Sequence, residues 1–135
     1  MNIECFVNKV ILGDCVDVMK GIDDGAVDVG ITSPPYFVGK EYEKNVLWED
    51  YDNMMGNCFK EIHRILKPGG YFIVNFGDYF NSGSRFYGAD VPSVYPASIN
   101  MFRWGRDVGF DLHATRIWRK SFAKMGINNS YGKLI

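Results

Sequence analysis

Short apolar runs alternate along this chain with longer segments in which apolar residues recur every three or four positions. The runs, each of which predicts a strand, lie at residues 10–14, 26–31, 71–76 and 110–118. The periodic segments predict helices at residues 50–66 and 97–108, with one or two further helical turns at 15–20. Strands that alternate with helices in this way are typical of a doubly wound α/β domain built on a parallel sheet.

The segment 50–66 carries the clearest helical signal. Its apolar residues form one stripe, made of Tyr51, Met54, Met55, Cys58, Ile62, Ile65 and Leu66. Asp50 is expected to cap the start of this helix, and Lys67-Pro68-Gly69-Gly70 to end it, because proline cannot continue the helical ladder. The run at 71–76 has almost no polar interruption, as expected for a strand in a sheet that is covered on both faces.

Size and composition support one domain with a packed core, since the chain has 135 residues, of which 47% are hydrophobic and 23% charged. The net charge of −1 argues against a strongly electrostatic partner for the chain as a whole. Residues 101–135 nevertheless contain seven Lys or Arg and only two Asp, so a basic end follows an acidic body. Charge alone leaves open whether this end faces phosphates or is an ordinary solvated surface.

Several classes of protein are not expected from this sequence. No apolar run approaches the roughly 20 residues that a membrane helix requires, and the N-terminus lacks the layout of a secretory signal. The three cysteines show no CxxC spacing, so neither a disulfide framework nor a zinc site is indicated. His63 and His113 stand alone, which favours helix or strand positions over metal binding. A reducing cytoplasm is therefore the expected location, with no bound metal and no membrane contact.

Three short polar segments each follow an apolar run. They are Gly13-Asp14, Ser33-Pro34-Pro35-Tyr36 and Gly77-Asp78. Ligands of open α/β sheets bind beyond the carboxyl ends of the strands, so we expect these segments to converge on one edge of the sheet.

The segment Ser33-Pro34-Pro35-Tyr36 has unusual backbone chemistry. Two successive prolines make a stiff, extended corner without N–H donors, which leaves a line of carbonyl acceptors beside an aromatic ring. Such a corner suits a flat ring that carries an amino group: the ring stacks on Tyr36, and the Ser33 hydroxyl and Pro34 carbonyl accept the amino hydrogens. The alternatives are a strand exit that uses prolines to stop pairing, or a proline-rich docking peptide.

This corner resembles the (D/N/S)PPY motif of amino-methyltransferases that use S-adenosylmethionine. Further segments similar to the DNA-modifying members occur in the family's usual order: Ile11 to Cys15, Arg64 to Gly70, Asn75 to Asp78 and Ile117 to Lys120. The resemblance covers roughly residues 10–124. The form with serine is similar to enzymes that methylate N4 of cytosine, whereas aspartate is more usual for N6 of adenine, so cytosine is favoured and adenine stays open.

The resemblance implies a site-specific DNA methyltransferase with a partial doubly wound, Rossmann-like sheet and flanking helices. It would transfer the methyl group of S-adenosylmethionine to the exocyclic amino group of a base flipped out of double-stranded DNA. The catalytic residues carried over are Ser33, Pro34, Pro35, Tyr36 and Asp78. The cofactor contacts carried over are Asp14, Cys15 and Ser33, with Asp14 near the adenine and ribose. Asp78 is expected to accept the proton released after transfer; its alternative role is that of a turn or cap aspartate.

One element of the family has no counterpart here, namely the glycine-rich FxGxG-type turn that cradles the methionine end of the cofactor. In a permuted branch, the catalytic half precedes the target-recognition region and the cofactor-binding half. Residues 1–135 resemble the first half, so we expect a single incomplete domain that lacks the cofactor cradle and most of the DNA-reading surface. The strand at 26–31 then keeps an apolar edge that favours pairing with a complementary half or self-association.

Three other functions remain open at this point. The chain is either a catalytically inactive remnant that binds DNA or a partner through its basic end, a methyltransferase acting on RNA or protein, or a purely structural α/β domain. Methyltransferases that act on RNA or protein resemble the NPPY form of the motif more than SPPY, which counts against that alternative.

Overall fold

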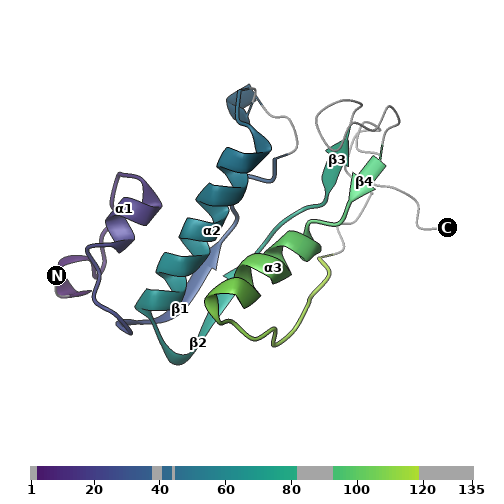
Figure 1. The fold of residues 1–135 in the computed structure, drawn as a ribbon. Coiled ribbons are helices and arrows are strands. Elements are labelled where there is room, and N and C mark those ends of the chain that lie inside the picture. Colours follow the sequence, from purple (N-terminus) through teal and green to yellow (C-terminus); the bar gives the residue numbers. More distant parts are fainter. Residues whose placement is uncertain (1–2, 38–40, 44, 82–92, 119–135) are drawn as a thin grey trace, which may run out of the picture.

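The computed structural model describes residues 3–37, 41–43, 45–81 and 93–118. Its helices are α1 (Cys15–Met19), α2 (Trp48–Ile65) and α3 (Ser98–Val108), with short 3-10 turns η1 (Ile3–Cys5) and η2 (Glu41–Glu43). Its strands are β1 (Val27–Thr32), β2 (Leu66–Val74), β3 (Tyr79–Asn81) and β4 (Ser93–Tyr95). β1 and β2 pair in parallel through the crossover helix α2, and β3 pairs antiparallel with β4 (Figure 1). The described residues thus form a mixed α/β fold with a small parallel sheet, as the alternating pattern predicts.

The start of β2 departs from regular pairing. Val27 pairs with Leu66 and Val29 already pairs with Tyr71, so the residues between Leu66 and Tyr71 bulge out of the ladder. Gly69 has φ 78°, a left-handed value that glycine adopts at little cost. A Cβ on Gly70 would lie 2.9 Å from the Asp28 carbonyl oxygen, so only glycine fits there. Residues 67–70, the segment expected to end the helix, lie inside β2 instead, because α2 ends earlier, at Ile65.

The boundaries of α2 also differ from the prediction at its start. The helix begins at Trp48 with Leu47 as its N-cap, which makes no side-chain capping bond. Asp50 instead lies in the first turn, where a negative charge interacts favourably with the helix dipole. Phe59 belongs to the buried face of α2, whereas Met54, assigned to the stripe by its spacing, is exposed.

The core lies between α2, α3 and one face of the parallel sheet. Its buried members are Phe37, Tyr51, Met55, Phe59, Ala97, Met101 and Trp104. Phe72 of β2 packs edge-on against Phe59, with ring centroids 5.1 Å apart. On β1, a Cβ at Gly30 would lie 2.8 Å from the Cδ1 of Ile62, so α2 packs directly on the strand backbone.

The other face of the sheet is largely open in the described residues, where the ring of His113 packs on Tyr71. This face presents Val29, Ile31, Tyr71 and Ile73, with exposed fractions of 48%, 73%, 54% and 51%. Helix α2 packs on the Phe72 side through Phe59 and Ile62, and Phe110 packs on the same side. The expectation of a sheet covered on both faces is therefore wrong for these residues, although the apolar character that prompted it is real.

Two predicted strands are absent. Residues 10–14 form no strand, and Val10 and Leu12 are fully exposed. Residues 110–118 are irregular. Phe110 instead packs on Phe72 and His63, after Gly109 ends α3 in a left-handed conformation with φ 109°.

The predicted basic end is described only in part. Arg103 pairs with Asp52, and Arg106 pairs with Asp111. The other Lys and Arg of residues 101–135 are Arg116, which is exposed, and Arg119, Lys120, Lys124 and Lys133, which lie outside the described residues. In the part of the chain that the structure describes, no helix has the length and apolar character needed to cross a membrane.

Candidate functional site

The carboxyl ends of β1 and β2 lie side by side. Thr32 pairs with Val74, and the Asn75 N–H donates to the Thr32 carbonyl oxygen at 2.9 Å. Ser33 and Asn75 therefore leave the sheet as neighbours, at the edge where open α/β sheets bind their ligands.

Three side chains at this edge form a cluster of polar contacts, which we call the amide–hydroxyl cluster. The Ser33 Oγ lies 2.8 Å from the Tyr36 hydroxyl oxygen. The Asn75 Nδ2 donates to the Tyr36 oxygen at 2.9 Å and makes a longer contact of 3.4 Å with Ser33 Oγ. Ser33 is exposed and Tyr36 half-buried, so the cluster is accessible from solvent.

The tyrosine ring packs against the chain that leaves β2. A Cβ on Gly77 would lie 3.3 Å from a ring carbon of Tyr36, closer than most such contacts. Glycine at this position therefore lets the ring approach the backbone, while Tyr36 keeps part of its surface open to a ligand.

The proline corner is anchored to the core by a hydrogen bond. The hydroxyl of Tyr51, a residue that is only 2% exposed, donates to the Pro35 carbonyl oxygen at 2.7 Å. This bond occupies the Pro35 carbonyl. Within the described residues, by contrast, no group donates to the carbonyl of Pro34, so that oxygen is left as an acceptor.

Phe37 ends the corner in a strained conformation. Its φ of 54° lies in the left-handed region, which non-glycine residues rarely adopt. The Phe37 N–H donates to the buried Glu43 carboxylate at 2.9 Å, and the Phe37 ring stacks on Tyr51 at 4.9 Å. Backbone strain of this kind persists only where surrounding contacts hold it, and it is concentrated at functional sites.

Asp78, the expected proton acceptor, lies in the segment that follows β2, after Asn75 and Gly77. Its Oδ1 accepts the N–H of Ala97 at 3.2 Å, just before α3 begins. Asp78 is exposed, and this bond ties the end of the site to the start of α3. Proton acceptor and turn or cap aspartate therefore both stay predictions for this residue.

Asp14, the expected cofactor contact, begins α1. Its Oδ1 accepts the N–H groups of Val16 and Asp17 at 2.9 and 3.2 Å, so it is the N-cap of this short helix. Cys15 is the first residue of α1, and its Sγ lies 3.5 Å from the Sγ of Cys58 on α2. Burial and the contact with Cys15 raise the pKa of the Cys58 thiol to about 12.

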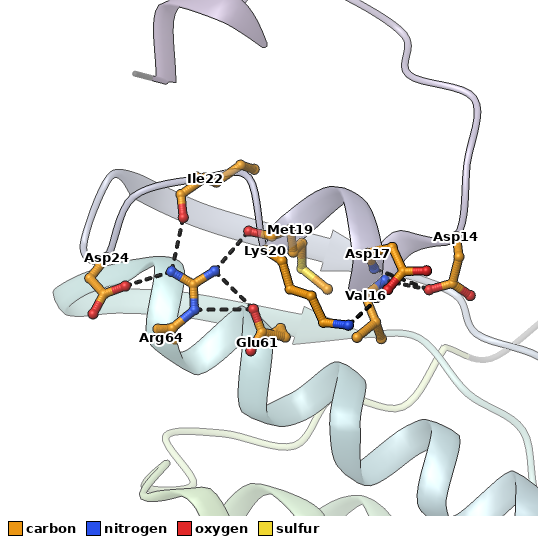
Figure 2. A network of polar contacts seen from close by, with 9 residues as sticks. All are labelled: Asp14, Val16, Asp17, Met19, Lys20, Ile22, Asp24, Glu61 and Arg64. Carbon is orange, nitrogen blue, oxygen red and sulfur yellow. Dashed lines mark hydrogen bonds and ion pairs between the residues drawn. The ribbon is translucent and has the colours of Figure 1, made fainter. Parts of the chain in front are cut away.

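Arg64 connects the segment that carries Asp14 to α2 (Figure 2). Its guanidinium donates to the carbonyl oxygens of Met19 and Ile22 at 2.7 and 2.9 Å. It also pairs with Asp24 at 2.5 Å and with Glu61 at 2.8 Å. These carboxylates raise the pKa of Arg64, Glu61 most strongly. The arginine thus fixes the end of α1 and the turn before β1 in place.

Sequence reasoning did not identify Asn75, Tyr51 or Arg64 as parts of the site or its support. Asn75 lies inside the strand predicted at residues 71–76, whereas in the structure it is the first residue after β2, as Ser33 is the first after β1. Within the described residues, no three His, Cys, Asp or Glu side chains are grouped to hold a metal ion. His63 packs against Phe110, and His113 against Tyr71.

A polar cluster at the carboxyl ends of parallel strands is the arrangement of an α/β enzyme domain, and sequence comparison identifies its family. The chain belongs to the DNA methylase family N6_N4_Mtase, which matches residues 27–133. This match includes both parallel strands and the whole amide–hydroxyl cluster.

Individual relatives are type II methyltransferases. The chain is 30% identical over 129 residues to the type II beta methyltransferase M.BslI of Bacillus sp. (strain NEB-606), an alignment that covers 93% of this chain and 14% of that protein. It is 33% identical over 117 residues to M.BglII of Bacillus subtilis, covering 82% of this chain and 32% of that protein. The chain therefore spans a third or less of the length of these relatives.

A solved structure supports the same fold. TTHA0409 of Thermus thermophilus, assigned as a DNA modification methylase, was crystallised in complex with S-adenosyl-L-methionine. It matches with a TM-score of 0.56 and 27% identity, over 74% of this chain and 39% of that one.

Proposed function

We propose that this chain supplies the amino-group receptor of a site-specific DNA methyltransferase. The reaction is methyl transfer from S-adenosylmethionine to the exocyclic amino group of a base flipped out of double-stranded DNA in the cytoplasm, with cytosine N4 favoured over adenine N6. The observation that carries the proposal is the amide–hydroxyl cluster of Ser33, Tyr36 and Asn75, exposed at the ends of two parallel strands. The type II relatives support DNA as the substrate.

The hydrogen bonds in the cluster are compatible with this role. Asn75 donates to the Tyr36 oxygen, and the bond between Tyr36 and Ser33 can run in either direction. When Ser33 donates to Tyr36, its own oxygen keeps a lone pair that can accept an N–H from a bound base. Asn75 and Tyr36 then orient Ser33 as an acceptor, and the Pro34 carbonyl is the second acceptor.

These two acceptors address the main chemical difficulty. The nitrogen lone pair of an aminopyrimidine is delocalised into the ring, so the free base is a poor nucleophile. Acceptors placed outside the ring plane favour a pyramidal nitrogen whose lone pair points at the methyl donor, with Tyr36 stacked on the base. Positioning and fixed dipoles then supply most of the rate enhancement.

Proton balance requires one more group. The amino nitrogen carries an extra proton after it accepts the methyl group, and this strongly acidic proton leaves without a strong base. Asp78 is the proposed acceptor. Its bond to Ala97 uses Oδ1, and the residue is exposed next to the exit of β2.

The residues described here fit one end of S-adenosylmethionine, which as a sulfonium supplies an activated methyl group. Asp14 is exposed and uses one oxygen, Oδ1, in both capping bonds, so its carboxylate is suited to the ribose hydroxyls, with Cys15 beside it and Ser33 toward the methyl group. No glycine-rich FxGxG segment occurs in the sequence for the methionine end.

We infer that a cofactor-binding half, following the permuted order, completes the domain. Two observations support this inference: the chain covers 39% of the matched methylase structure, and the outer sheet face is apolar and open. That half would add strands beside β1, restore the doubly wound sheet and supply the cofactor cradle.

The test is a methylation assay with labelled S-adenosylmethionine and duplex DNA, on the chain alone and with the separately supplied cofactor-binding half of a DNA methylase relative. We expect incorporation only in the mixture, and its loss with Ser33→Ala. Nucleoside analysis of the product identifies N4-methylcytosine or N6-methyladenine.

A soluble, associated pair that leaves DNA unmethylated would contradict the proposal and favour the inactive remnant, which DNA binding by the chain alone would further support. Methylation of RNA or protein but not of DNA would also overturn it.

A further inference from the structure

Two of the three cysteines face each other across the packed helices α1 and α2. The Sγ atoms of Cys15 and Cys58 lie 3.5 Å apart, although the residues are 43 positions apart in the sequence. Cys15 is exposed, whereas Cys58 is partly buried. The proposed methyl transfer forms no bond to a cysteine, so neither thiol reacts in that chemistry.

We propose that Cys15 and Cys58 form an oxidation site at which a peroxide converts the two thiols into an intrachain disulfide. Two thiols alone do not make a zinc site, which usually requires four ligands. In the described residues, no third metal-ligating side chain is grouped with them. Oxidation is therefore the chemistry that this pair supports.

The structure assigns different roles to the two sulfurs. Cys15 is exposed, so a dissolved peroxide reaches it first. Burial, with the bond to Cys15 second, raises the pKa of Cys58 to about 12, which keeps it a thiol at neutral pH. Cys15 is accordingly the attacking sulfur and Cys58 the resolving one.

The reaction balances in two steps. The Cys15 thiolate attacks the O–O bond of hydrogen peroxide, forming a sulfenic acid and releasing hydroxide. The Cys58 sulfur then attacks the sulfenic sulfur, the S–S bond forms, and the departing hydroxyl leaves as water with the Cys58 proton. In total, two thiols are oxidised and one peroxide is reduced, giving one disulfide and two waters.

Local structure keeps the two sulfurs opposite each other. A disulfide requires an S–S distance of about 2.05 Å, so the sulfurs approach by roughly 1.5 Å. Asp14 caps the start of α1, and Arg64 of α2 holds the carbonyl of Met19 at its end. Helix α1 has only five residues and an exposed start, so a small rotation of this helix closes the gap.

Oxidation would change the proposed cofactor edge, because Cys15 follows Asp14. This consequence rests on the proposed function. The oxidation itself does not, and it is tested by counting thiols and mapping peptides, without any assay of methyl transfer.

Trypsin separates the three cysteines, since Lys9, Lys20, Lys44 and Lys60 divide them among three peptides. The reduced full chain is treated with one equivalent of hydrogen peroxide and digested without reductant. We expect the titratable thiols to fall from three to one, and peptides 10–20 and 45–60 to appear joined, with two hydrogens lost and restored by dithiothreitol. The midpoint of thermal unfolding should rise in the oxidised chain.

Two variants complete the test. Cys5→Ser removes the third, exposed cysteine and should still form the link, with thiols falling from two to none. Cys58→Ser should leave Cys15 as a sulfenic acid that dimedone traps. A link that joins Cys5 to either residue, a link only between chains, or three unchanged thiols under conditions that oxidise free cysteine would overturn the proposal.

Discussion

The amide of Asn75 donates a hydrogen bond of 2.9 Å to the hydroxyl oxygen of Tyr36, and so joins the end of β2 to the corner that follows β1. The pairing of the strands brings the two residues together, because the Asn75 N–H is itself bonded to the Thr32 carbonyl. The geometry of the proposed receptor therefore depends on the parallel register as much as on the Ser-Pro-Pro-Tyr segment.

We predict that Asn75→Ala lowers the kcat of the complemented enzyme about 10- to 100-fold, with little change in the KM for DNA, because Ser33 and Tyr36 lose their orientation. Steady-state kinetics measures both constants. Tyr36→Phe should cost a similar factor, and the double variant little more, since both changes break one unit. Additive losses, or an equal loss in the exposed control Asn57→Ala, would contradict the positioning role.

Tyr51→Phe removes the part-buried bond between the Tyr51 hydroxyl and the Pro35 carbonyl. We expect the free energy of unfolding to fall by about 1–2 kcal/mol, as measured by urea denaturation. The control is Tyr71→Phe, which changes an exposed tyrosine on the open sheet face and should alter stability by less than about 0.5 kcal/mol. Equal effects in the two variants would show that the Tyr51 hydroxyl does not support the corner.

Arg64→Lys should destabilise the fold by about 1–3 kcal/mol. A single ammonium cannot replace a planar guanidinium that reaches two carbonyl groups and two carboxylates. The matched control is Arg106→Lys, because Arg106 forms an exposed pair with Asp111 and should contribute at most about 0.5 kcal/mol. Chemical denaturation measures the free energy of unfolding of both variants. A control that is as destabilised as Arg64→Lys would contradict the role of the Arg64 network.

The raised pKa of Cys58 predicts a loss of stability at alkaline pH. Its folded value is about 12 and its ordinary value 9.0, so between these limits the unfolded chain releases a proton that the folded chain retains. The free energy of unfolding is therefore unaffected by this thiol below pH 9.0. Above pH 9.0 it declines, by up to about 1.4 kcal/mol per pH unit. Unfolding measured under reducing conditions at pH 8 and pH 10 should show a smaller decline in Cys58→Ser; equal declines would mean that another group is responsible.

The parts of the fold that could be predicted are those whose signal is local. Periodicity found α2 and α3, and the β-branched run found β1, because each element buries one face against its neighbours. Residues 10–14 show the limit of this reasoning, because an apolar run becomes a strand only beside a partner, and none pairs with it in the described residues. The pairing of β3 with β4 likewise depends on a partner strand beyond the intervening residues 82–92.

The same division applies to the candidate site. The stiffness of Pro34-Pro35 and the hydroxyls of Ser33 and Tyr36 could be read directly from four consecutive residues. Asn75 could not, because its contact with Tyr36 depends on strand register across 39 positions. The bond from Tyr51 to Pro35 likewise depends on how α2 packs under the corner.

The outer face of Val29, Ile31, Tyr71 and Ile73 also has a consequence for the behaviour of the chain in solution. Sulfate and phosphate salts are excluded from protein surfaces and therefore strengthen the attraction between apolar faces. Salt screens interactions between charges, but it does not weaken this apolar attraction. The isolated chain should therefore salt out at low ammonium sulfate concentrations, and dilution should keep it dispersed better than added electrolyte.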